Sequence, residues 1–255
     1  MSETPGTRRL QGKVAVVTGA ASGIGAGIAL AFAEQGAALA LVDVVAGPRV
    51  EAQTSTLSGY GVPVARYQAD VSDESEVRLM GREVLARFGR VDILVNNAGI
   101  FTQAPVEHLP IEDWDRVLAV NLRGTFLCTK AFLGAMLDQG SGRIINIASQ
   151  LGQIGGTEVA HYAASKAAVI GLTKSLAREV AQRGVLVNAV APGPVETPIL
   201  QNETDEWRSA KLAELPIGRF GRVEEVVPTV LLLATDDGSY YVGQTLGPNG
   251  GDVML

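Results

Sequence analysis

A tyrosine and a lysine one helical turn apart form the pair in this sequence that is best suited to acid–base chemistry. Tyr162 and Lys166 lie four positions apart at the start of an expected helix over 163–183, so both side chains project from one face. A phenol has an ordinary pKa of about 10, and a base at neutral pH needs a shift of about three units, or ~4 kcal/mol. An ammonium ~4 Å away in a partly buried site supplies an effect of that size. The same spacing is frequent on solvated helices, so it does not by itself distinguish a catalytic pair from a surface pair.

A glycine-rich turn after the first expected strand could hold the phosphates of a dinucleotide. A strand over 13–18 runs into the turn at 18–25, and a helix over 25–35 follows. Glycines let the backbone approach a pyrophosphate closely, and the free N–H groups of a helix N-terminus attract it. The spacing is G-x-x-x-G-x-G rather than the common G-x-G-x-x-G, so an ordinary tight turn is the alternative.

An acidic residue at the end of the second expected strand indicates which dinucleotide would bind. Asp43 stands 24 positions after Gly19, where a carboxylate can accept hydrogen bonds from both ribose hydroxyls of an adenosine. Its charge would also repel a 2′-phosphate. The alternative is an aspartate that ends a strand and begins a turn. Combined with the glycine turn at this distance, Asp43 predicts NAD rather than NADP as the cofactor.

The elements that must position these residues alternate between short apolar strands and longer helices. The expected strands are 13–18, 38–43, 62–67, 91–95, 143–148, 185–190 and 244–247, and the expected helices include 25–35, 74–88, 111–137, 163–183 and 223–234. Nearly continuous apolar strands are typical of a parallel sheet that helices cover on both faces. The pattern predicts an α/β fold with a single doubly wound parallel sheet of about seven strands, which is Rossmann-like. Residues 1–11 are expected to form a flexible tail, and 12–255 one dinucleotide-binding and catalytic domain.

Composition and charge favour a small-molecule partner. The 255 residues carry a net charge of −6, which argues against binding to nucleic acid or to an anionic membrane surface. No apolar segment reaches the length of a membrane span or a secretory signal. The single Cys128 cannot form an intrachain disulfide, so we expect a cytoplasmic protein. His108 and His161 lack partners at metal-ligand spacing, and no metal is expected.

Taken together, these motifs resemble the short-chain dehydrogenase/reductase family over 12–251. The matching residues are the turn at 18–25, Asp70-Val71, Asn96-Asn97-Ala98-Gly99, Asn121, Ser149, Tyr162, Lys166, and Pro192-Gly193 with Thr197. The resemblance implies that Tyr162 exchanges a proton with the substrate oxygen and that Ser149 hydrogen-bonds the same oxygen. It also implies that Lys166 lowers the pKa of Tyr162 and binds the nicotinamide ribose, and that Asn121 holds a water linking Lys166 to solvent.

The resemblance further implies a set of cofactor contacts and a homotetramer. Asp70 and Val71 would lie at the adenine, Asn97 and Gly99 beside the adenine ribose, and Pro192, Val195 and Thr197 around the nicotinamide amide. The full expected set is Gly19, Ser22, Gly23, Ile24, Gly25, Asp43, Asp70, Val71, Asn97, Ala98, Gly99, Tyr162, Lys166, Pro192, Gly193, Val195 and Thr197. The expected helices 111–137 and 163–183 carry apolar residues on more than one face, as contact with a partner subunit or a larger core would require.

Substrate choice is expected to depend on loops beyond the strand ends, including a lid at about 195–220. The expected pocket residues are Leu151, Ile154, Val159, Ile199 and Leu200. These apolar side chains favour an apolar alcohol or ketone, or an acyl chain, over a sugar.

Within the family, the overall pattern is most similar to the 3-oxoacyl-carrier-protein reductases. That similarity implies NADPH and an acidic carrier protein that docks on basic residues. Asp43 disfavours the phosphate, Gly140 stands where such a reductase can carry arginine, and Arg183 retains the second docking position. The ending at 248–251 also replaces the family's usual Asp-Gly-Gly.

We therefore predict an oxidoreductase that transfers a hydride between NAD(H) and a secondary alcohol or ketone. A 3-oxoacyl-thioester reductase acting on a carrier-protein or CoA thioester is the alternative enzyme. A non-catalytic, NAD-sensing scaffold is the alternative of another class. The complete set Asn121, Ser149, Tyr162 and Lys166 counts against the scaffold, because binding alone needs no proton-transfer residues.

Overall fold

Seven parallel strands form one sheet in the computed structural model, which describes residues 8–255 apart from the side chains of Pro48, Arg49 and Asn202. The strands are β1 (Val14–Thr18), β2 (Ala38–Asp43), β3 (Val64–Gln68), β4 (Ile93–Asn96), β5 (Gly142–Ile147), β6 (Val185–Val190) and β7 (Thr245–Leu246). Their order is β3-β2-β1-β4-β5-β6-β7, and each neighbouring pair is parallel. The predicted doubly wound, Rossmann-like sheet is confirmed. The order reverses between β1 and β4, and the carboxyl ends of the strands diverge there.

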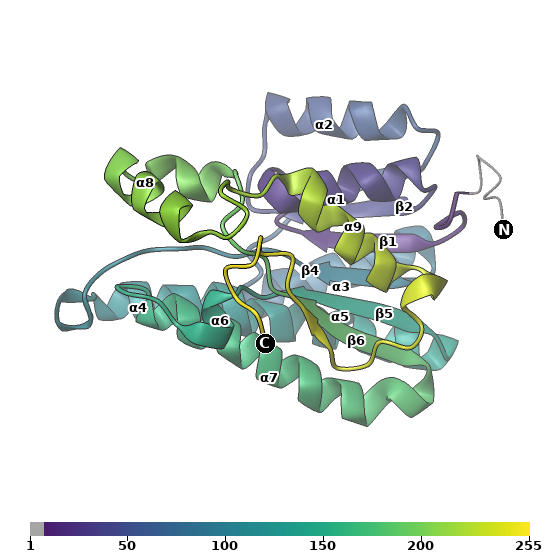
Figure 1. Cartoon of the computed structure of the whole chain (residues 1–255). Coiled ribbons are helices and arrows are strands. Elements are labelled where there is room, and N and C mark those ends of the chain that lie inside the picture. The colour runs from purple at the N-terminus through teal and green to yellow at the C-terminus, as the bar shows by residue number, and fades with distance from the viewer. Residues whose placement is uncertain (1–7) are drawn as a thin grey trace, which may run out of the picture.

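Helices cover both faces of the sheet, which explains why the strands are apolar along their whole length (Figure 1). One layer holds α1 (Gly23–Glu34), α2 (Pro48–Ser58) and α9 (Val223–Ala234), and the other holds α3 (Glu74–Phe88), α5 (Gly124–Gln139) and α7 (Ala160–Val180). Successive residues of β1 enter the two cores in turn: Val17 packs in the first layer and Val16 in the second. Both are fully buried.

The expected helix over 111–137 is divided by one wide turn. It comprises α4 (Ile111–Leu118), a π-helical turn (Ala119–Arg123) and α5. Such π-turns insert an extra residue into a helix and are frequent at functional sites. Here the turn holds Asn121, which is fully buried.

Helix α2 was missed by the sequence analysis, which placed no helix between β2 and β3. Its side chains are mostly exposed, and Val50 and Leu57 are the two buried apolar residues among those described. Two apolar positions give only a weak helical period. The available signal was Pro48 in the first turn directly after Gly47, a common start of a helix.

Several short elements complete the described chain. They are Val106–His108, α6 (Leu151–Ile154), Ala181–Arg183, Pro198–Asn202, α8 (Asp205–Glu214) and Asp236–Gly238. Helix α7 begins three residues earlier than expected, so Tyr162 and Lys166 both lie inside its first two turns. Among the described residues, no helix combines the length and the apolar character needed to cross a membrane.

The expected flexible tail over 1–11 extends too far into the folded chain. Leu10 is 1% exposed within the first core, and its N–H donates to the carbonyl of Gln35 at 2.9 Å. The Arg8 guanidinium donates to the carbonyl of Tyr60 at 2.8 Å. Residues 8–11 therefore belong to the domain, and residues 1–7 lie outside the described part of the chain.

A buried chain of amides and hydroxyls fixes two helices to the centre of the sheet. Asn96 of β4 donates through Nδ2 to Oδ1 of Asn146 on β5 at 2.8 Å and to Thr129 of α5 at 3.1 Å. Asn146 in turn donates to Oγ1 of Thr173 on α7 at 2.9 Å. All four side chains are buried, so losing one partner leaves a desolvated polar group unpaired.

We expect Asn146→Ala to lower the free energy of unfolding by about 2 kcal/mol, because it removes two buried hydrogen bonds and leaves Thr173 without its donor. Chemical denaturation measures this value. Ser55→Ala removes an exposed hydroxyl bond within α2 and serves as the control, with an expected change below ~0.5 kcal/mol. Equal stability of the two variants would contradict the role assigned to the buried chain.

Candidate active site

A cavity of about 670 Å³ lies at the carboxyl edge of the sheet, where the strand order reverses. Residues that end or follow each of the strands β1 to β6 line it, from Gly19 after β1 to Pro192 after β6. Helix α8 contributes Lys211 to the opposite wall. Ligands of open α/β sheets bind at this edge, because loops from two diverging strands leave a crevice there.

The glycine-rich turn between β1 and α1 is held in a form that only glycine permits. Gly19 has a φ of +63°, and a Cβ there would lie 2.8 Å from Cα of Ala98. A Cβ on Gly25 would lie 2.1 Å from the carbonyl oxygen of Gly19. The side chain of Asn97 locks the turn by donating from Nδ2 to the carbonyls of Thr18 and Gly19, at 3.0 Å each.

The first turn of α1 meets the cavity at this point. Ser22 precedes the helix without a side-chain cap bond, and Gly23 and Ile24 line the cavity. The backbone N–H groups of the first turn of this twelve-residue helix are thus left without a side-chain partner. Close backbone approach together with these donors fits the pyrophosphate of a dinucleotide.

Asp43 lies at the end of β2, beside the glycine-rich turn in the same crevice. Its Oδ2 accepts from the N–H of Ala21 at 2.9 Å, and its Oδ1 accepts from the N–H of Val45 at 3.1 Å. The carboxylate lines the cavity and joins the end of β2 to the glycine turn. Asp43 therefore orders the turn that follows β2, which was the alternative to a cofactor role. Its carboxylate also lies in a position suited to binding ribose hydroxyls.

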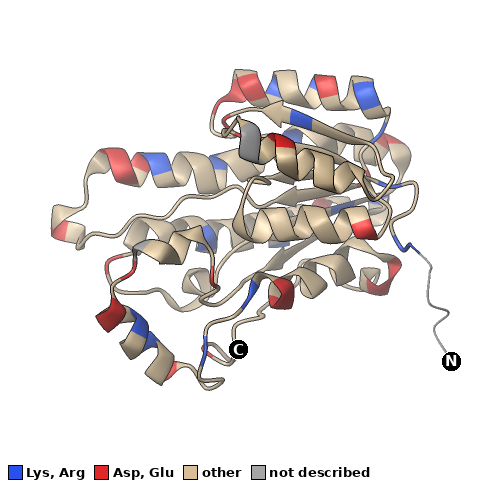
Figure 2. Cartoon of the chain, turned by 90° about the horizontal axis from the view of Figure 1, so that it is seen from above, with Lys and Arg blue, Asp and Glu red and all other residues tan. Residues whose placement is uncertain are grey.

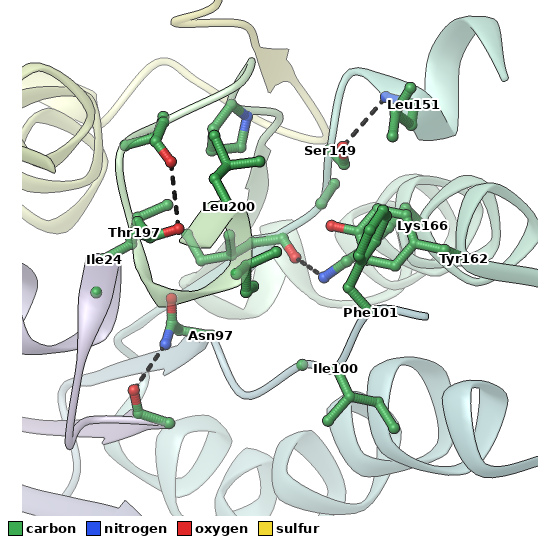
Figure 3. A pocket seen from close by; sticks show the side chains of 18 of the residues that line it. Ile24, Asn97, Ile100, Phe101, Ser149, Leu151, Tyr162, Lys166, Thr197 and Leu200 are labelled. Atoms are coloured by element: carbon green, nitrogen blue, oxygen red, sulfur yellow. Dashed lines mark hydrogen bonds between the residues drawn. The ribbon is translucent and has the colours of Figure 1, made fainter. Parts of the chain in front are cut away.

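The side chains of Tyr162, Lys166 and Ser149 meet on the wall beyond the turn (Figure 3). Tyr162 and Lys166 come from consecutive turns of α7, and Lys166 Nζ lies 5.7 Å from the centroid of the phenol ring. Lys166 Nζ also donates to the carbonyl of Ile147 at 2.8 Å. Ser149 follows β5, and its Oγ accepts from the N–H of Leu151 at 3.1 Å. That bond leaves the hydroxyl hydrogen of Ser149 available to another acceptor.

Burial shifts the pKa values of the two titrating groups in opposite directions. It raises the pKa of Tyr162 to about 12, and the hydrogen bond with Ser149 acts against this shift. It lowers the pKa of Lys166 to about 8. A dry site disfavours the charged form of each group, which is an anion for the phenol and a cation for the amine. Burial is the largest cause of the Tyr162 shift, and the lowering of its pKa by Lys166 stays a prediction.

Asn121 lies behind this group and holds the loop after β4. Its Oδ1 accepts from the N–H of Ile100 at 2.8 Å, and its Nδ2 donates to the carbonyl of Ile100 at 3.0 Å and to Ser165 at 3.1 Å. The amide is occupied by these three bonds. Asn121 lies in the π-turn, and its role in a proton relay stays a prediction.

The loop that Asn121 holds carries an aromatic wall of the cavity. Phe101 packs edge-on against the ring of Tyr162, with centroids 4.9 Å apart and an interplanar angle of 83°. The next residue, Thr102, has its Oγ1 2.6 Å from Nε2 of His161. His161 is fully buried, and burial lowers its pKa. Neutral His161 thus ties the Phe101 loop to the start of α7.

The structure brings the predicted site residues together almost completely. All five expected pocket residues line the cavity, namely Leu151, Ile154, Val159, Ile199 and Leu200. Of the expected cofactor residues, Gly25 lies beneath the turn instead of on the cavity surface, and the other sixteen line it. Leu200 has a second role, because it also packs with Leu215 and Phe220 in a small core of the segment 195–220.

Sequence reasoning missed several polar residues around the cavity, and three of them contact one another. Gln150 and Lys211 line the cavity, and both contact Asp252 near the C-terminus. The contacts join positions 102 and 41 residues apart in the chain. No local pattern in the sequence indicates such pairings.

A doubly wound sheet with a glycine-rich turn after β1, an acidic residue at the end of β2 and a Ser-Tyr-Lys group on the cavity wall is typical of a dinucleotide-dependent oxidoreductase. The family model described as short chain dehydrogenase matches residues 13–208. The chain belongs to the short-chain dehydrogenase/reductase family, whose members transfer hydride.

Individual relatives support the same assignment over nearly the whole chain. The chain is 42% identical to a 3-oxoacyl-(acyl-carrier-protein) reductase of Thermotoga maritima, over 96% of this chain and 100% of the relative. It is similar to levodione reductase, with a TM-score of 0.89, 36% identity, and coverage of 95% and 98%. A protein of Beutenbergia cavernae, assigned as an NAD(P)-dependent gluconate 5-dehydrogenase and holding NADP at low occupancy, gives a TM-score of 0.90 at 43% identity, with coverage of 96% and 98%.

We expect Lys166→Met to raise the free energy of unfolding at pH 7, because it removes a buried ammonium whose pKa is lowered to about 8. Between about pH 8 and the ordinary value of 10.5, the unfolded chain binds more protons than the folded chain, so stability of the parent protein rises with pH. The gain of the variant should shrink over that window. Denaturation at several pH values measures it.

Lys130→Met removes an exposed ammonium on α5 and is the matched control. The same pH-dependent gain in both variants would show that the effect does not come from burial of Lys166.

Proposed function

We propose that the protein transfers a hydride between NAD(H) and a secondary alcohol or ketone, with Tyr162 as the catalytic acid/base. The observation that carries this proposal is the meeting of Tyr162, Ser149 and Lys166 on a partly apolar cavity wall. Bound NAD(H) supplies or accepts the hydride, which no side chain of the chain can do. The residues of the cavity then bind, orient and exchange a proton.

In ketone reduction, the phenol of Tyr162 donates its proton to the oxygen of the forming alcohol. Its raised pKa keeps it protonated at neutral pH, and this is the form that donates. Ser149 donates a hydrogen bond to the same oxygen as negative charge develops on it. Lys166 uses one N–H on Ile147 and has others free for Tyr162 and for a ribose hydroxyl. Alcohol oxidation reverses these steps.

The remaining cofactor contacts follow the order of the strands. The first turn of α1 would bind the pyrophosphate, Asp70 and Val71 the adenine, and Pro192 to Thr197 the nicotinamide amide. Asp43 supports NAD, because a carboxylate fixed by two backbone N–H groups binds ribose hydroxyls and repels a 2′-phosphate. The NADP held by the relative from Beutenbergia cavernae makes the phosphorylated cofactor the alternative.

A 3-oxoacyl-thioester reductase is the second candidate. Its support is the name of the relative from Thermotoga maritima, which matches at 42% identity over its full length. The apolar wall would also accept an acyl chain. Against docking of an acidic carrier protein, Gly140 stands where such a reductase can carry arginine, and the ribbon in Figure 2 shows positions of Lys and Arg interspersed with positions of Asp and Glu. A non-catalytic scaffold is the least supported function, because the proton-transfer residues are assembled.

We also propose a homotetramer that works in the cytoplasm. Large apolar side chains on α4 and α5 are exposed, namely Ile111, Trp114 and Phe126, and a partner subunit would cover them.

Cys128 is buried, and burial raises the pKa of its thiol to about 12, so the thiol is inert.

Tyr162→Phe should lower kcat by about 10²-fold or more while NADH still binds, because it removes the proton donor and keeps the ring. Reduced-cofactor absorbance with secondary alcohols and ketones measures turnover, and nucleotide fluorescence measures binding. Tyr60→Phe removes a hydroxyl that bonds Glu34 on the surface and is the control. Undiminished turnover in the first variant would overturn the assignment of Tyr162.

Asp43→Asn should narrow the preference for NAD over NADP by about tenfold, or ~1.4 kcal/mol. Asparagine keeps an oxygen that can accept from Ala21 and removes the charge that repels a 2′-phosphate. The ratio of kcat/KM with the two cofactors measures the effect. An unchanged ratio would assign Asp43 to the turn alone.

A further inference from the structure

The substrate side of the cavity contains a lysine that two carboxylates neutralise. Lys211 lies on α8, lines the cavity and keeps a side-chain exposure of 19%. Its Nζ lies 2.7 Å from Oδ2 and 3.0 Å from Oδ1 of Asp252, and 3.1 Å from Oε2 of Glu214. The side chain of Asp252 is 8% exposed, so this ion pair is far less screened than the surface pair of Lys211 with Glu214.

A third residue holds Asp252 in place from the catalytic loop. Gln150 directly follows Ser149, is 3% exposed, and donates from Nε2 to Oδ2 of Asp252. Asp252 therefore connects the Ser149 loop with Lys211 on α8. The lysine is therefore fixed in the cavity wall by contacts that lead to the Ser149 loop.

The charges on this side of the cavity are unfavourable for an anion. Among the described residues, three cationic side chains line the cavity. Lys166 belongs to the reacting group, Arg116 pairs with Asp70, and Lys211 is the third. Glu203 and Glu214 also line the wall, and Asp252 lies against Lys211. A carboxylate or phosphate on the substrate would lose water here and gain no free positive partner.

We propose that Asp252 determines substrate specificity: by neutralising Lys211, it restricts the enzyme to alcohols and ketones that are uncharged at the end facing α8. The proposal rests on the proposed function, since it names the substrate class of that same site. Without the negative charge at position 252, Lys211 would be available to pair with an anionic substrate.

An isosteric pair of ketones tests this assignment. The kcat/KM values of 4-oxocyclohexanecarboxylate and 4-oxocyclohexanecarboxamide are measured with NADH as the cofactor. The two values are compared in the parent protein and in Asp252→Asn. Asparagine keeps an oxygen for Gln150 and removes the charge. We expect the ratio of carboxylate to carboxamide to rise about tenfold in the variant. An unchanged ratio, including an equal loss for both ketones, would overturn the proposal and leave Asp252 a purely structural contact.

Three variants separate charge from shape. Asp252→Glu keeps the charge and should keep the parent preference. Adding Lys211→Met to Asp252→Asn should remove the gain, because no cation is left to pair with the carboxylate. Asp237→Asn removes a surface carboxylate paired with Arg9 and should leave the ratio unchanged. A gain that persists without Lys211, or that appears in Asp237→Asn, would contradict the role of the lysine.

A binding measurement distinguishes this proposal from the proposed function. Cyclohexanecarboxylate and cyclohexanecarboxamide are titrated into the enzyme with NADH, followed by nucleotide fluorescence. Relative to the carboxamide, the carboxylate should bind about tenfold tighter in Asp252→Asn than in the parent protein. If the parent protein reduces no ketone and oxidises no secondary alcohol, the proposed function fails while this ratio still decides the role of Asp252. An unchanged binding ratio overturns the role of Asp252 whatever the turnover.

Discussion

All seven strands run parallel, and this single constraint places the chemistry of the molecule at one edge of the sheet. Parallel strands require a crossover after each strand, so every carboxyl end points the same way and each opens into a loop. Five residues that end or follow five different strands line one cavity for this reason, namely Gly19, Asp43, Asn97, Ser149 and Pro192. The crossover helices bury both faces of the sheet, and a reversal of strand order then opens the crevice between β1 and β4.

Burial at that edge has a direct chemical consequence. The same dry environment raises the pKa of Tyr162 and lowers that of Lys166, since each shift favours the neutral form. A phenol that stays protonated is suited to donate in ketone reduction, whereas alcohol oxidation requires positive charge near it to stabilise the phenolate. The position of Lys166 one turn away supplies such a charge where the amine is protonated. Burial and the lysine thus act on the phenol in opposite senses.

The sequence was sufficient for those parts of the molecule whose signals are local. The alternation of apolar strands and helices predicted the sheet, and the family resemblance supplied the expected cofactor residues, of which sixteen of seventeen line the cavity. Helix α2 was missed because Val50 and Leu57 give almost no period, and the π-turn at Asn121 was missed because its extra residue leaves no mark in composition. The Lys211–Asp252 pair depends on two segments meeting in space, which no spacing along the chain reveals.

This difference between local and long-range determinants also explains which properties similar proteins share. Ser149 follows β5, and Tyr162 and Lys166 lie in the first two turns of α7, so the fold fixes these residues, and relatives at 42% or 43% identity share the class of reaction. The substrate wall is assembled from the Ser149 loop, α8 and the C-terminal segment, and a change in any one alters its charge. The charge of this wall depends on Lys211 and Asp252, which come from α8 and the C-terminal segment, so it can change while Ser149, Tyr162 and Lys166 stay in place.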